Sequence, residues 1–94
     1  MNPPTLACAQ SIRDGGIDAV AALNDALSRA MVGLESHEQN DLKRVFARVM
    51  AELVTEIINP VIAAYPELSP DDETWASIAR ARAAERSSGA QPQP

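Results

Sequence analysis

The chain has 94 residues, which is enough for a single small domain. Its composition is 46% hydrophobic and 22% charged, as in an ordinary globular protein. The net charge of −5 repels the phosphates of nucleic acids and of anionic lipids, so both are expected to be absent as partners of this acidic protein. A single cysteine, Cys8, excludes an internal disulfide and a zinc site made of several cysteines.

The sequence lacks the segments that direct a chain to or through a membrane. Residues 1–5 have neither the basic start nor the apolar run of a signal peptide. The most apolar stretch, residues 45–65, contains Arg48, Glu52 and Glu56, each of which would cost roughly 2–3 kcal/mol or more inside a bilayer. We therefore expect a cytoplasmic protein.

Two short helices are predicted in the first third of the chain, after an N-terminal extension of residues 1–4. The first covers residues 5–14 with Thr5 as its cap, and Gly15-Gly16 is expected to end it, because paired glycines favour turns. The second covers residues 17–32, where apolar residues recur every three or four positions, and Gly33 stops it.

The third predicted helix is the longest and covers residues 36–65. Ser36 and Gln39 form a capping-box pattern at its start. Pro60 interrupts the pattern, and two interpretations follow: the helix kinks and continues, or it ends and a new one begins with Asn59 as its cap. We favour the kinked continuation, because the apolar spacing runs across the proline unchanged.

A fourth helix is predicted at residues 70–86, after a linker that contains Pro66 and Pro70. Ser69 would cap it, Pro70 would occupy its first position, and three acidic residues follow. The remaining residues, 87–94, are small and polar and are expected to be a disordered tail. These elements predict an all-α fold, a small bundle of three to four helices within residues 5–86, with the kinked helix 36–65 at its centre.

The apolar face of residues 36–65 is unusually wide. Its later apolar pairs repeat every four residues rather than every 3.6, so the stripe rotates along the helix and spans an arc of about 220°, against a little over 100° for an ordinary surface helix. We expect the excess to form a homodimer interface, because exposed apolar patches usually mark contacts. The alternative is that the chain folds back and buries it all. The predicted interface residues are Val54, Ile57, Ile58, Val61, Ile62 and Tyr65.

No catalytic motif is present, and we expect neither an enzyme nor a cofactor. The sequence predicts a non-enzymatic helical module that mediates protein–protein interaction, self-associates and also binds another protein. The alternative is a small metal-binding or ligand-binding helical protein. It would use the cluster from Glu35 to Asp41 around His37, the carboxylates Glu52 and Glu56, or a cavity between aromatic residues. Those aromatic residues are Phe46, Tyr65 and Trp75.

Overall fold

The computed structural model describes residues 1–89, and within them the prediction of an all-α fold is confirmed. The α-helices are α1 (Leu6–Ala30), α2 (Ser36–Leu53), α3 (Asn59–Ala64) and α4 (Asp72–Gly89). A π-helical turn, η1 (Val54–Ile58), joins α2 to α3, and a 3-10 turn, η2 (Pro66–Leu68), follows α3.

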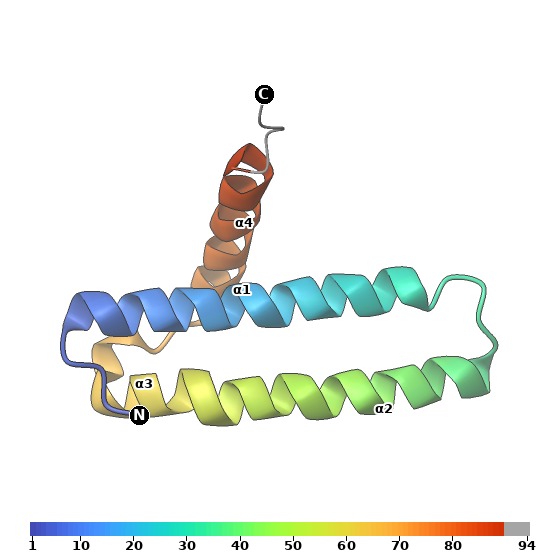
Figure 1. The fold of residues 1–94 in the computed structure, drawn as a ribbon, viewed down its shortest axis with the longest axis horizontal. Helices are drawn as coiled ribbons and strands as arrows, with labels where there is room; N and C mark the ends of the chain where they lie inside the picture. Colours follow the sequence, from blue (N-terminus) through green and yellow to red (C-terminus); the bar gives the residue numbers. More distant parts are fainter. Residues whose placement is uncertain (90–94) are drawn as a thin grey trace.

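The arrangement is a long antiparallel hairpin with a crossing helix. Figure 1 shows α1 along one edge of the hairpin and α2, η1 and α3 in succession along the other. Helix α4 packs against α1, and its C-terminal end projects away from the hairpin. The central helix is therefore α1, which contacts α2, η1, α3 and α4, and the prediction that residues 36–65 form the centre is wrong.

The predicted break at Gly15-Gly16 is also wrong, because α1 passes through both glycines without interruption. A glycine inside a helix costs about 1 kcal/mol relative to alanine, which tertiary packing can outweigh. Gly16 is buried against η1, and a Cβ at this position would lie 2.8 Å from Cγ1 of Ile58. Gly16 therefore lets two helices approach closely, and the predicted helices 5–14 and 17–32 are one.

Side chains cap three helices, and only the first cap matches its prediction. The Thr5 hydroxyl accepts a hydrogen bond from the backbone N–H of Cys8 at 3.1 Å, which confirms this cap. The capping box of α2 uses Glu35 and Glu38, one residue before the predicted pair. Helix α4 is capped by Asp71, whose carboxylate accepts from the N–H of Thr74 at 2.7 Å, rather than by Ser69.

The two replaced caps have different local causes. Glu35 has extended backbone angles and takes the cap position itself, so Gln39 is free to bind the preceding loop. The side-chain amide of Gln39 donates to the carbonyls of Met31 at 3.2 Å and Leu34 at 3.3 Å. Before α4, Ser69 is extended, and the helix begins two residues later than predicted, at Asp72.

The chain stays helical through Pro60 because a π-helical turn precedes the proline. In a regular α-helix the proline ring would collide with the carbonyl of Glu56. Here the N–H of Asn59 donates to the carbonyl of Val54, five residues back, and this wider turn relieves the crowding. Asn59 has right-handed helical angles, so it does not cap a separate helix. The kink of the axis at Pro60 stays a prediction.

The core lies at one end of the hairpin. Ala9, Val61 and Leu68 form a buried cluster, and Ile12 and Tyr65 pack against it. Ile17, Leu27 and Ile58 are buried as well. None of the 18 residues of α2 is fully buried. The end of the hairpin near its 31–35 loop is thus thinly covered.

Helix α4 extends further than predicted. Ser87 and Ser88 are helical, which corrects the prediction of a tail from residue 87 onward, whereas residues 90–94 lie outside the described part of the chain. Arg86 forms an ion pair with Asp18 of α1 and so ties α4 to α1.

Candidate interaction surface

The six predicted interface residues all lie at the core end of the hairpin. Ile58 is 1% exposed beside Gly16, and Val61 is fully buried in the cluster with Ala9. These two residues therefore belong to the core of the single chain, and the expectation that they form an exposed patch is wrong. For Ile58 the physical reason is the missing side chain of Gly16, which lets α1 approach η1 closely. Val61 of α3 is instead covered in the cluster with Ala9 and Leu68.

The other four predicted residues are half-buried, and their contact with a second copy stays a prediction. These are Val54, Ile57, Ile62 and Tyr65. The hydroxyl of Tyr65 also donates to the carbonyl of Pro3 at 2.9 Å, so this residue ties the N-terminal extension to the core. At this end of the hairpin, most of the predicted apolar surface is thus covered or partly covered by the chain itself.

A different apolar surface is left open nearer the 31–35 loop. On α2, Val45 is 47% exposed and Val49 is 43% exposed. On α1, three alanines at four-residue spacing are also exposed. We call these five residues the hairpin face: Ala22, Ala26, Ala30, Val45 and Val49.

The alanines of α1 and the valines of α2 that form the two rows of the hairpin face lie on the same broad side of the hairpin. The buried Leu27 marks the side of α1 that faces α2, and the half-buried Phe46 marks the corresponding side of α2. Ala26 and Val45 each precede one of these residues, and one residue turns a helix by about 100°. When two antiparallel helices pack side by side, the residue that precedes the contact residue points to the same side of the pair on both helices. Ala26 and Val45 therefore lie on one side of the hairpin.

The two rows also lie at the same height along the hairpin. Gly16 is level with Ile58 at the core end, and the carbonyl of Met31 is bonded to the side chain of Gln39 at the loop end. Counting inward from both anchors places Ala22 beside Val49 and Ala26 beside Val45, within about one helical turn. The hairpin face is therefore one continuous, uncharged patch.

Charged side chains border this patch on its outer edges. On α1, Arg29 pairs with Asp25 at 3.2 Å, and on α2, Arg44 lies 4.0 Å from Asp41. All four are well exposed, so each pair contributes little to the stability of the monomer. They remain available to a partner that covers the face.

The acidic residues proposed for metal binding or catalysis form capping contacts or lie exposed on the surface. Glu35 and Glu38 form the capping box of α2, and His37 lies 3.6 Å from Glu35 on the exposed surface. Within the described residues there is no group of three or more histidine, cysteine or acidic side chains that would hold a metal ion. Glu52 and Glu56 are exposed.

The three aromatic residues proposed to line a ligand cavity are not brought together. Phe46 lies on α2, Tyr65 follows α3 at the core end, and Trp75 belongs to α4. Along the helical path, Phe46 and Tyr65 are separated by about 25 Å or more. No pocket is found among residues 1–89.

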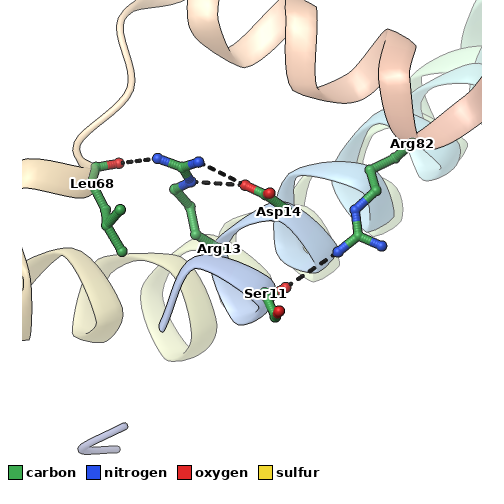
Figure 2. Close-up of polar contacts among 5 residues, drawn as sticks. All are labelled: Ser11, Arg13, Asp14, Leu68 and Arg82. Atoms are coloured by element: carbon green, nitrogen blue, oxygen red, sulfur yellow. Dashed lines mark hydrogen bonds and ion pairs between the residues drawn. The ribbon is translucent and has the colours of Figure 1, made fainter. Parts of the chain in front are cut away.

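Polar contacts at the core end involve residues that sequence reasoning missed. Figure 2 shows Arg13, which is buried, donating from Nη1 to the carbonyl of Leu68 at 3.0 Å and from Nε to Asp14 at 2.9 Å. Arg82 of α4 donates to the carbonyl of Ser11 at 3.5 Å. Asp18, by pairing with Arg86, raises the pKa of that arginine.

These contacts fasten η2 and α4 to α1 and are structural. Arg13 has no distinctive local signal, since an arginine in an amphipathic helix is usually exposed. Its carbonyl partner is also 55 residues away in the sequence.

No family model, curated protein or solved structure matches this chain. Among residues 1–89, no helix has both the length and the apolar character required to cross a membrane.

Proposed function

We propose that this chain is a non-enzymatic helical module for protein–protein interaction that self-associates as a homodimer in the cytoplasm. The observation that carries the proposal is the lack of a fully buried residue on α2, for which α1 is the main packing partner. Helices in small domains gain most of their stability by burying an apolar face. A second copy would supply the missing layer.

The size of the molecule supports the same proposal. The radius of gyration is 15.4 Å, whereas a compact chain of this length has about 12 Å. The accessible surface is 6325 Å², against about 5,200 Å² for a compact monomer of the same mass. The excess of about 1,100 Å² is comparable with the roughly 800 Å² that each partner buries in a standard interface.

Analytical ultracentrifugation of the wild-type chain tests this function. At micromolar concentration we expect a species of about 20 kDa, twice the 10.0 kDa of one chain, and a thermal unfolding midpoint that rises with protein concentration. A 10.0 kDa species at all concentrations, with an unfolding midpoint independent of concentration, would contradict the proposal.

A further inference from the structure

We propose that the second copy docks on the hairpin face, with the twofold axis parallel to the hairpin, so that α1 of each copy lies on α2 of the other. This inference rests on the proposed self-association and names its surface and geometry. The result is a four-helix bundle in which every neighbouring pair of helices is antiparallel.

The shape of the face suits this arrangement. A rotation about an axis parallel to the hairpin leaves the height of each residue unchanged, so Val45 meets Ala26 of the partner copy and Val49 meets Ala22 of the partner copy. Branched valine side chains then fill the space above small alanine side chains, which allows two helices to approach closely. The face therefore complements itself.

The charges at the rim support a second copy as the occupant. In the same arrangement Arg29 comes level with Asp41 of the partner copy, and Asp25 comes level with Arg48 of the partner copy. Both pairs combine opposite charges, and the twofold axis makes each pair twice. Two copies that each carry a net charge of −5 repel one another overall, but these pairs provide attractive contacts where the copies meet.

The other twofold arrangement is disfavoured by like charges. With the axis in the plane of the face but perpendicular to the hairpin, α2 would lie antiparallel on α2 of the partner copy. Centring the valine row would then put Glu38 opposite Glu56 of the partner copy. Glu38 of α2 and Glu56 of η1 are both exposed, and helical spacing places them on the side that carries the valines, so their repulsion opposes this arrangement.

Disulfide trapping between two different variants tests the geometry. In a Cys8→Ser background, a chain with Ala26→Cys is mixed with a chain carrying Val45→Cys and then oxidised. We expect a covalent dimer in the mixture and little in either variant alone, because only the mixture brings residues 26 and 45 of different chains together. Asn24→Cys, which lies on the opposite side of α1, is the matched control and should not crosslink to Val45→Cys.

Substitutions at the face give a second readout that does not depend on oxidation. Ala26→Glu should convert the dimer to a monomer, whereas Asn24→Glu should leave it intact, and both positions are exposed so the monomer fold is retained. Arg29→Glu should weaken the dimer about tenfold, and adding Asp41→Arg should restore it, because the reversed pair is again complementary. Circular dichroism checks that each variant keeps its helix content.

The outcomes separate the two proposals. If wild type sediments as a dimer but Ala26→Glu has no effect and the mixture does not crosslink, the docking geometry is wrong while self-association stands. If wild type is a monomer at every concentration, both proposals are wrong. If crosslinking appears in Ala26→Cys alone, the perpendicular axis replaces the parallel one.

Discussion

Replacing Gly16 by alanine should destabilise the hairpin, although alanine is the better helix former. In an unhindered helix interior this change stabilises by about 0.5–1 kcal/mol. At Gly16 the new Cβ would lie 2.8 Å from Cγ1 and 3.3 Å from Cδ1 of Ile58, and 3.4 Å from Cγ2 of Ile57. The first distance is shorter than real Cβ contacts, so the side chain or the helices must move.

Ile58 has little room to move. It is 1% exposed, and Cγ1 lies next to its branch point rather than at the end of a flexible chain. Forcing an extra methyl group into a packed core costs about 1–3 kcal/mol. After subtraction of the helix preference, we expect Gly16→Ala to lower the free energy of unfolding by about 0.5–2 kcal/mol.

Gly15 provides the matched control, because a Cβ there would meet nothing within 4 Å. Gly15→Ala should therefore raise the free energy of unfolding by about 0.5–1 kcal/mol. Urea titrations followed by circular dichroism, at one fixed protein concentration, measure both changes. The corresponding shifts of the melting temperature are about 4–8 °C per kcal/mol for a domain of this size, in opposite directions.

A double-mutant cycle tests whether the side chain of Ile58 causes the destabilisation by Gly16→Ala. Ile58→Ala removes Cγ1 and costs about 2–5 kcal/mol by itself. In that background Gly16→Ala should become neutral or stabilising, because its Cβ now fills space. If Gly16→Ala instead stabilises the wild type as much as Gly15→Ala does, α1 does not approach η1 closely and the account of the hairpin is refuted.

Two further predictions concern Arg13 and Asp71. Arg13→Met should cost about 1–3 kcal/mol in urea titrations, because the carbonyl of Leu68 loses its buried donor. The exposed Arg80→Met should change stability by less than about 0.5 kcal/mol, and equal effects would contradict the role of Arg13. The N–H of Thr74 lowers the pKa of Asp71 from its ordinary value of 3.8. The stability that Asp71 provides is therefore complete above that value and is lost as the pH falls through the lower pKa of the folded state. Asp71→Asn should flatten the loss of helical circular dichroism between about pH 5 and pH 2, and an unchanged acid titration would rule out this cap.

Much of the secondary structure follows from local rules. The existence of the helices, the Thr5 cap, the turn at Gly33 and the helical path through Pro60 all follow from apolar spacing and from residues close to each feature. The capping residues of α2 and α4 were misplaced by one or two positions. Glutamate, serine and aspartate compete for such caps, and the choice depends on small differences in backbone angle.

The candidate surface was harder to predict, because burial depends on contacts between distant segments. The wide apolar arc of residues 36–65 is real, but a count of apolar residues cannot say which part α1 covers. The structure buries Ile58 and Val61 and leaves Val45 and Val49 open, so the uncovered surface lies nearer the loop than predicted.

The sequence by itself determined that this protein is helical, because the spacing of apolar residues and the helix caps act within a few residues. Only the tertiary structure decided what the two adjacent glycines do. In isolation they resemble a turn, whereas in the structure both are helical and Gly16 packs closely against Ile58 on the opposite arm of the hairpin. The cost of about 1 kcal/mol for a glycine inside a helix is outweighed by packing between the two arms of the hairpin. This packing depends on residues more than 40 positions apart in the sequence.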